Sequence, residues 1–172
     1  MPAFDPERIL ATLVRHGADV IVVGGIGGVL HGSPMPTEDV DVVPKLDIAS
    51  LDALAEALNE LNAKIRSHDA PDGLLKVDWT GRDIRRWIVD FRWLNLETDF
   101  GRLDLIHRPG GTNGYRDLSH GAERIQIGDV WIKVAALEDI IRSKQAVGRD
   151  RDLEQLPTLR MLLEKKRGRD DG

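Results

Sequence analysis

The sequence predicts an α+β fold, with a mixed β-sheet flanked by helices and two further helices at the C-terminal end. Three observations indicate it: short β-branched runs alternate with amphipathic segments, the middle is strand-rich, and the last segments have helical periodicity. The 172 residues suffice for one sizeable core. We therefore expect one domain over 1–172, with 164–172 as a frayed tail because no apolar residue remains there.

The first third of the chain predicts helix, strand, short helix, strand and helix in that order. Apolar residues at helical spacing between Pro6 and Gly17 predict the first helix. The run "ADVIVVGG" predicts a buried strand closed by glycines, and "IGGVLHG" is compatible with one or two helical turns. "EDVDVVP" predicts a second strand that ends at Pro44, and "IASLDALAEALNELNA" predicts a helix.

The remainder predicts several strands followed by two helices. In "RWIVDFRWLNLET", Trp87, Val89, Phe91 and Trp93 alternate as in a strand, and "GRLDLIH" predicts another. A Gly-Asp turn in "RIQIGDVWIKVAA" predicts a hairpin. "ALEDIIRSKQAVG" and "RDLEQLPTLRMLLEK" predict helices, and we expect all the tryptophans to lie on strands, in the core or a groove wall.

Composition excludes several kinds of site. The absence of cysteine excludes disulfides, thiolate metal sites and cysteine nucleophiles. The net charge of -5 argues against a surface dominated by nonspecific nucleic-acid or membrane binding, although 24 Lys and Arg residues leave room for a local basic groove. No aromatic–basic alternation indicates a platform for single strands. Without a signal-peptide pattern or a long apolar run, we expect a cytoplasmic protein that does not interact with membranes.

Three aspartates interrupt apolar strand patterns. Asp39 and Asp41 are two residues apart, so their carboxylates share one face of a strand, roughly 7 Å apart. Asp104 lies between two leucines in the same way. A solvated sheet face would accommodate such residues, but three carboxylates on adjacent strands would also hold two Mg²⁺ ions for phosphoryl transfer. Gly24 and Gly25 lie just upstream, where exposed backbone N–H groups would receive phosphates.

The stretch "VGGIGGVLHGSPMPTEDVDVV" resembles the nucleotidyltransferase superfamily with the polymerase-β-like core. The similarity extends over Val20 to Leu163 and includes small bacterial stand-alone members, some related to toxins of abortive-infection toxin–antitoxin systems. It implies that Asp39, Asp41 and Asp104 are catalytic metal ligands for two Mg²⁺ ions, with Mn²⁺ as a substitute. It also implies that Gly24 and Gly25 contact the nucleotide phosphates.

Further residues are candidate nucleotide contacts. Lys144 lies on the apolar stripe of its predicted helix, so its ammonium faces either water or the phosphates, and the spacing in relatives favours the phosphates. Arg149 is a candidate phosphate contact, and Asp152 would cap the next helix or pair with Arg149. Thr37 would contact ligand or shape the turn after a proline.

The resemblance implies transfer of a nucleoside monophosphate from an NTP to a hydroxyl acceptor, with release of pyrophosphate. The acceptor stays open among RNA such as a tRNA end, a protein and a small molecule, and a cognate antitoxin is a candidate partner. Many relatives have an arginine where this chain has Met35. This difference favours an alternative: a catalytically weak or inactive nucleotide- or partner-binding module. A metal-dependent phosphohydrolase using the same carboxylates is a third possibility.

Overall fold

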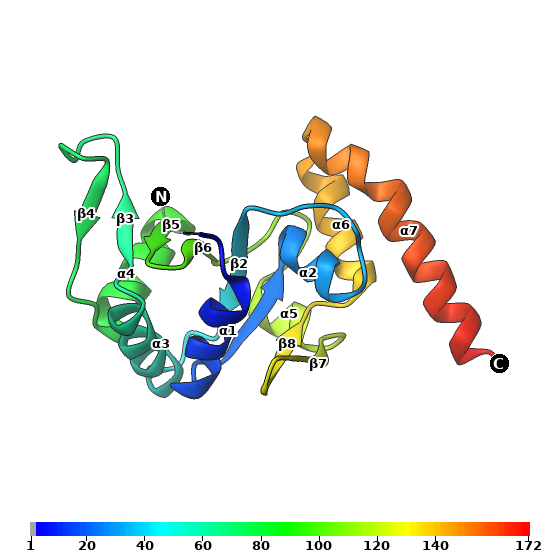
Figure 1. The fold of residues 1–172 in the computed structure, drawn as a ribbon, viewed down its shortest axis with the longest axis horizontal. Helices are drawn as coiled ribbons and strands as arrows, with labels where there is room; N and C mark the ends of the chain where they lie inside the picture. The colour runs from blue at the N-terminus through cyan, green and yellow to red at the C-terminus, as the bar shows by residue number, and fades with distance from the viewer. Residues whose placement is uncertain (1–2) are drawn as a thin grey trace.

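The computed structural model describes residues 3–172, which form one eight-stranded mixed sheet with helices packed against it (Figure 1). The strand order is β4-β3-β5-β6-β2-β1-β8-β7. The strands are β1 (Val20–Val23), β2 (Asp39–Pro44), β3 (Lys64–Arg66), β4 (Leu74–Lys76), β5 (Trp93–Thr98), β6 (Gly101–Ile106), β7 (Glu123–Ile127) and β8 (Val130–Val134). The helices are α1 (Pro6–Arg15), α2 (Gly24–Leu30), α3 (Ile48–Glu60), α4 (Gly81–Phe91), α5 (Tyr115–Ser119), α6 (Leu137–Val147) and α7 (Asp150–Asp170). The α+β fold class predicted from the sequence is confirmed.

The helices cover the two faces of the sheet unequally. Helices α1, α3 and α4 share the larger core with β2, β5 and β6, through residues such as Leu54, Ile84 and Leu103. A second core lies on the other side and joins β1 and β2 to α5, α6 and α7, through residues such as Ile21 and Ile140. Both faces are therefore packed in the β1–β2 half, whereas β3 and β5 bury only the face toward α3 and α4.

The strand predicted across Trp87 to Trp93 is wrong in its first part. Residues 81–91 form α4, and β5 begins only at Trp93. The Thr80 side chain caps α4 by accepting a hydrogen bond from the backbone of Asp83. Ile84 and Ile88, four residues apart, are the fully buried contacts of this helix. The apolar residues of this segment also alternate, which imitates the pattern of a strand. The contacts that its residues at helical spacing make with the core nevertheless stabilise a helix.

The tryptophans do not all lie on strands, which corrects the sequence-based expectation. Trp79 precedes α4, is buried, and donates its indole hydrogen bond to the Ala63 carbonyl at 2.8 Å. Trp87 lies within α4. Trp93 and Trp131 lie on β5 and β8, and the side chains of both are at least half exposed.

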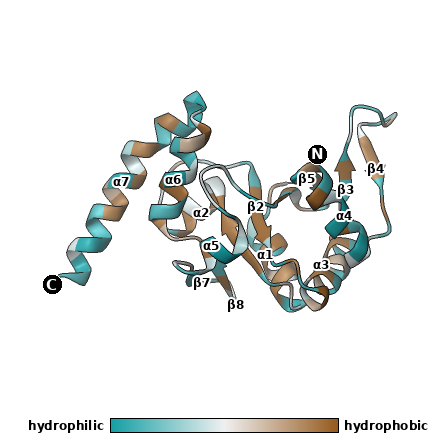
Figure 2. Cartoon of the chain, turned by 180° about the vertical axis from the view of Figure 1, so that it is seen from behind, coloured by the Kyte–Doolittle hydropathy of each residue, from teal (hydrophilic) through white to brown (hydrophobic). Residues whose placement is uncertain are grey.

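Helix α7 extends away from the sheet and continues to Asp170 (Figure 1). Its C-terminal turns are mainly hydrophilic (Figure 2). Lys166 forms an ion pair with Glu123, and Arg167 lies 3.7 Å from Glu138. The single-domain boundary and the fraying of residues 164–172 stay predictions. Within residues 3–172, none of the helices combines the length and apolar character that a membrane crossing needs.

Candidate active site

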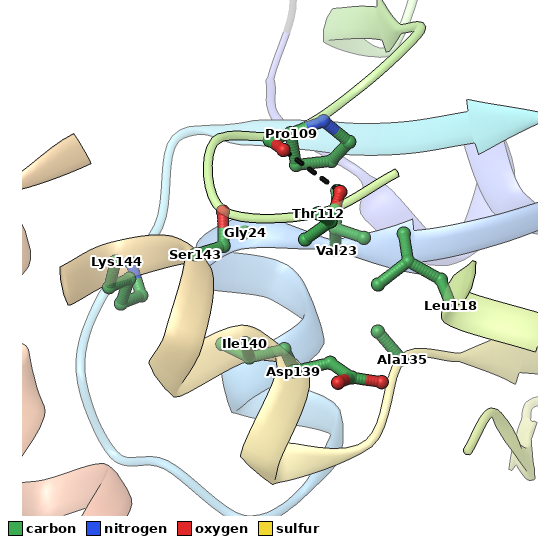
Figure 3. A pocket seen from close by; sticks show the side chains of 10 residues that line it. All are labelled: Val23, Gly24, Pro109, Thr112, Leu118, Ala135, Asp139, Ile140, Ser143 and Lys144. Atoms are coloured by element: carbon green, nitrogen blue, oxygen red, sulfur yellow. Dashed lines mark hydrogen bonds between the residues drawn. The ribbon is translucent and has the colours of Figure 1, made fainter. Parts of the chain in front are cut away.

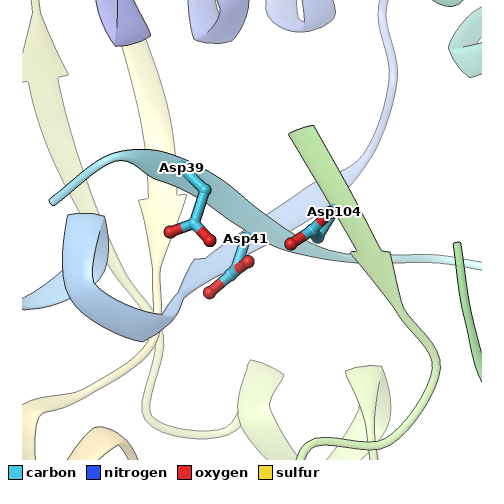
Figure 4. Close-up of side chains that lie close together, drawn as sticks. All are labelled: Asp39, Asp41 and Asp104. Atoms are coloured by element: carbon cyan, nitrogen blue, oxygen red, sulfur yellow. The ribbon is translucent and has the colours of Figure 1, made fainter. Parts of the chain in front are cut away.

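Strand pairing brings the three sequence-predicted aspartates together. Strand β2 runs parallel to β6, and this register places Asp41 directly beside Asp104. Asp39 lies two residues earlier on the same face of β2, and all three carboxylates converge on one space (Figure 4). One oxygen from each lies within 4.8 Å of the others. All three donors are hard oxygens, which are the ligands that Mg²⁺ and Mn²⁺ prefer, so the donor set fits a divalent metal.

The electrostatics of this cluster favour a bound cation. Burial, followed by the neighbouring charges of Asp39 and Asp104, raises the pKa of Asp41 to about 7, against the opposing effect of Lys144. Burial also raises the pKa of Asp104, whereas the nearby Arg66 guanidinium lowers it. The ionised cluster is therefore destabilised by desolvation and by mutual repulsion, both of which a metal ion would relieve.

The raised pKa of Asp41 predicts an unusual dependence of stability on pH. In metal-free buffer the folded protein holds a proton on Asp41 between pH 3.8 and about 7, where the unfolded chain has lost it. The free energy of unfolding should therefore fall as pH rises through this window, by up to about 1.4 kcal/mol per pH unit from this group. Asp41→Asn should remove that contribution. Urea unfolding of both proteins across this range measures it, and a difference between them that does not change with pH would contradict it.

The glycine pair packs closely against β2 and the turn that precedes it. Strand β1 pairs antiparallel with β2 and places Val23 opposite Asp41, so the chain turns into α2 next to the acidic cluster. Gly24 has a φ of +67°, and a Cβ there would overlap the Asp41 carboxylate. A Cβ on Gly25 would lie 3.0 Å from the Thr37 hydroxyl. Glycine therefore allows α2 to begin in contact with β2.

Thr37 has a local structural contact. Its hydroxyl donates a hydrogen bond to the backbone carbonyl of Asp39 at 3.2 Å, which fixes the turn before β2. The side chain also lines the same cleft as Gly25. The predicted role in nucleotide binding stays a prediction, since the structural role accounts for the observed hydrogen bond.

A cleft of about 810 Å³ opens over the carboxylates and has cations on its opposite wall. Lys144 on α6 is almost fully buried, and its ammonium lies 3.6 Å from Asp152. It is therefore not a lysine with its ammonium in open water, which was one interpretation of the sequence. Arg149 donates a hydrogen bond from Nε to the same carboxylate at 2.8 Å. Asp152 therefore pairs with Arg149, which is one of the two roles that the sequence predicted for it. Burial lowers the pKa of Lys144, against the opposing charges of Asp152 and Asp41.

A second, much smaller cavity lies behind Gly24. It measures about 30 Å³ and is enclosed by α6 and a loop in which Thr112 donates a hydrogen bond to the Pro109 carbonyl at 2.8 Å (Figure 3). This volume holds about one or two water molecules. The larger cleft is therefore the candidate substrate site.

The structure adds residues that the sequence did not single out. Arg66 on β3 places its Nη2 3.4 Å from a carboxylate oxygen of Asp104. Arg102 precedes Asp104 by two residues on β6, and Asn95 extends the same face on β5. Trp93, which the sequence predicted on a strand in the core or a groove wall, lies on that face of β5 and lines the cleft. The position of Arg102 could have been predicted from the sequence, because a residue two positions before Asp104 on a strand lies on the same face. The contact of Arg66 with Asp104 could not be predicted, because it depends on the pairing of β3 with β5, which the sequence did not indicate.

Comparison with solved structures identifies the fold. No protein-family model matches the sequence, and no curated protein sequence matches it. One structural match is the lincomycin-bound lincosamide antibiotic adenylyltransferase LnuA, with a TM-score of 0.61, 15% identity, and coverage of 94% of this chain and 99% of that chain. The chain has the nucleotidyltransferase fold. A candidate nucleotidyltransferase from Thermotoga maritima also matches, with a TM-score of 0.53, 17% identity, and coverage of 95% of this chain and 97% of that chain.

The nucleotidyltransferase fold covers nearly the whole chain in both comparisons. The acidic cluster therefore does not belong to a small fragment with a chance similarity. At these identities the comparisons describe the fold, whereas the chemistry of this chain has to be inferred from its own residues.

Proposed function

We propose that this chain is a metal-dependent nucleotidyltransferase that transfers a nucleoside monophosphate from an NTP to a hydroxyl acceptor and releases pyrophosphate. The observation that carries the proposal is the convergence of Asp39, Asp41 and Asp104 within 4.8 Å on adjacent strands. The same cleft contains Lys144 and Arg149 on the other side of the carboxylates. A negatively charged triphosphate would lie between these cations and metal ions held by the carboxylates.

Each side chain has a role that follows from its position. Asp39, Asp41 and Asp104 would hold one or two Mg²⁺ ions, which when bound neutralise phosphate charge and polarise the reacting phosphoryl group. The backbone N–H groups of Gly24 and Gly25 would donate to the phosphates.

The chemistry needs a group that accepts a proton from the incoming hydroxyl. The Asp104 carboxylate lies at the side of the cluster away from Lys144, which places it to act as the general base. The acceptor oxygen would attack the α-phosphorus while the bond to the bridging oxygen of the β-phosphate breaks. The hydroxyl proton would pass to Asp104, and pyrophosphate would leave past Lys144 and Arg149.

Lys144→Met tests the phosphate role of the buried ammonium. The substitution should weaken NTP binding by about 1.5–3 kcal/mol, the scale of a hydrogen bond to a charged group, because methionine retains the stem but not the charge. The loss should be smaller for a nucleoside monophosphate, which lacks the β- and γ-phosphates. Calorimetric titration measures both affinities.

Lys165→Met provides the matched control, since Lys165 is an exposed lysine on α7. It should leave NTP affinity unchanged. Equal NTP affinities for the parent and a folded Lys144→Met protein would exclude the phosphate role.

Met35 supports one alternative function. The side chain borders a small cavity beside Lys144. At this position many members of the superfamily that the sequence resembles have an arginine. A chain without that cation would bind NTP without turning it over. Arg149 and Arg151 nevertheless line the larger cleft and supply positive charge there, which favours the enzyme.

Product analysis separates these functions. The protein is incubated with Mg²⁺, NTPs radiolabelled at the α-phosphate, and acceptor pools of RNA, protein and small hydroxyl compounds that include lincomycin. Pyrophosphate release with label on an acceptor supports the nucleotidyltransferase. Free phosphate without labelled acceptor indicates a phosphohydrolase. NTP binding without turnover in any pool indicates the binding module.

A further inference from the structure

One face of the sheet beyond the carboxylates is left open. Its side chains alternate with the buried positions of β3, β5 and β6, and the residues of the open face used below are Lys64, Arg66, Lys76, Trp93, Asn95 and Arg102. None of them is buried. The register makes the face continuous with the acidic cluster, because Asn95 pairs directly with Asp104.

The open face concentrates positive charge in a chain whose net charge is -5. Lys64 lies directly opposite Lys76 on β4, and like charges in that position destabilise a sheet unless an anion lies between them. Neither lysine has a carboxylate within ion-pair distance among residues 3–172. Glu97 offsets part of this charge, since it lies directly opposite Lys64 on β5 and 3.8 Å from Arg102. A lysine on the edge strand β4 also protects against aggregation, but that reason does not apply to Lys64 on the internal strand β3.

An aromatic side chain lies on the same face, on the other side of Asp104 from Lys64 and Arg102, because Trp93 pairs with Ile106 whereas Glu97 pairs with Arg102 and Lys64. Trp93 is 58% exposed although it lies on a strand, and it lines the cleft together with Asn95. Exposed aromatic rings beside cations form the stacking surfaces that bind single-stranded nucleic acids. The sequence shows no such alternation because these residues come from four separate strands.

The open face also lies on the acceptor side of the cleft. The proposed function assigns the side of Lys144 and Arg149 to the triphosphate, which leaves the side of Asp104 for the attacking hydroxyl. Arg66 joins the open face to Asp104 through its contact at 3.4 Å. Its Nε is buried and lacks a hydrogen-bond partner among the described residues, so Arg66 has a donor that the described part of the protein does not satisfy.

We propose that the acceptor is a single-stranded nucleic acid, whose terminal hydroxyl reaches Asp104 while a base stacks on Trp93 and backbone phosphates lie along Lys64, Lys76 and Arg102. This inference rests on the proposed function. The terminal oxygen bonds to the α-phosphorus of the NTP, the bond to the β-phosphate oxygen breaks, the hydroxyl proton passes to Asp104, and pyrophosphate leaves. The acceptor becomes one nucleotide longer. A polycationic small acceptor would be repelled by this face, and a neutral one would not need its lysines.

Fluorescence anisotropy with a short fluorescein-labelled single-stranded RNA tests the proposal without requiring turnover. Lys64→Gln with Lys76→Gln should weaken binding about tenfold or more, and should reduce the slope of log affinity against log salt by about 1.4, which corresponds to two lost phosphate contacts. Trp93→Ala should weaken binding about five- to 100-fold with an unchanged salt slope, because stacking does not release counterions.

Arg82→Gln with Arg86→Gln is the matched control. It removes the same charge from exposed positions of α4, on the covered side of the sheet, and should leave RNA affinity unchanged. RNA that ends in a deoxy sugar without the terminal hydroxyl should bind but receive no label from the NTP.

The outcomes separate this inference from the function on which it rests. Failure to bind RNA, with intact binding of Mg-NTP, overturns the nucleic-acid acceptor and leaves the nucleotidyltransferase standing. Lysine variants that bind RNA as the parent does, or label that appears on protein or lincomycin instead of RNA, overturn it as well. Absence of Mg-NTP binding overturns both.

Discussion

Asp39→Asn combined with Asp41→Asn should abolish divalent-metal binding and reduce nucleotidyl transfer at least about 1,000-fold, because a bound metal supplies several kcal/mol of charge stabilisation in phosphoryl transfer. The protein should remain folded. The carboxylates face the cleft, while Val40 and Val42 on the other side of β2 belong to the larger core. Titration calorimetry with Mn²⁺ and an assay of pyrophosphate release measure the two effects.

Asp78→Asn with Asp90→Asn is the matched control for charge. Both residues are exposed and lie outside the cleft, so this variant should bind Mn²⁺ and transfer nucleotide as the parent does. Undiminished metal affinity in the folded Asp39 and Asp41 variant would exclude these residues as the metal site.

Asp104→Asn should separate binding from chemistry. Loss of a general base costs typically about 100- to 10,000-fold in rate, so turnover should fall in that range. NTP affinity should change much less, since Lys144 and Arg149 are retained. Asparagine keeps an oxygen that accepts the hydrogen bond of Arg66, which limits the structural disturbance. Pre-steady-state transfer with saturating NTP, together with calorimetric NTP affinity, gives the two quantities.

A parallel loss of affinity and turnover in Asp104→Asn would instead indicate a structural role. Arg66→Gln serves as the comparison, because it removes the partner of Asp104 and leaves the carboxylate in place. If Asp104 is the base, Arg66→Gln should reduce turnover less than Asp104→Asn does.

Local sequence pattern sufficed to place two of the three acidic residues together. Side chains two apart on a strand share a face whatever the strand packs against, so Asp39 and Asp41 could be placed together without knowing the fold. Asp104 had the same pattern, although its position beside Asp41 depended on the parallel pairing of β2 with β6. The glycine turn was equally local, since Gly24 lies one residue beyond β1.

The remainder of the cleft could not be predicted because it depends on long-range pairing. Arg66 reaches Asp104 only because β3 pairs with β5 and β5 with β6. The alternation of Trp87, Val89 and Phe91 imitates a strand, whereas the contacts of Ile84 with the core select a helix. That error concealed the start of β5 at Trp93, and with it the open face.

The most direct measurement of the central claim is a crystal structure with Mn²⁺ and an NTP analogue whose α- and β-phosphates are joined by a non-hydrolysable methylene bridge. Anomalous scattering locates the metal independently of the refined coordinates. The expected result is Mn²⁺ bound by Asp39 and Asp41, with the triphosphate between Gly24 and Lys144. Anomalous density elsewhere, with the carboxylates unliganded and the triphosphate outside the cleft, would contradict the account.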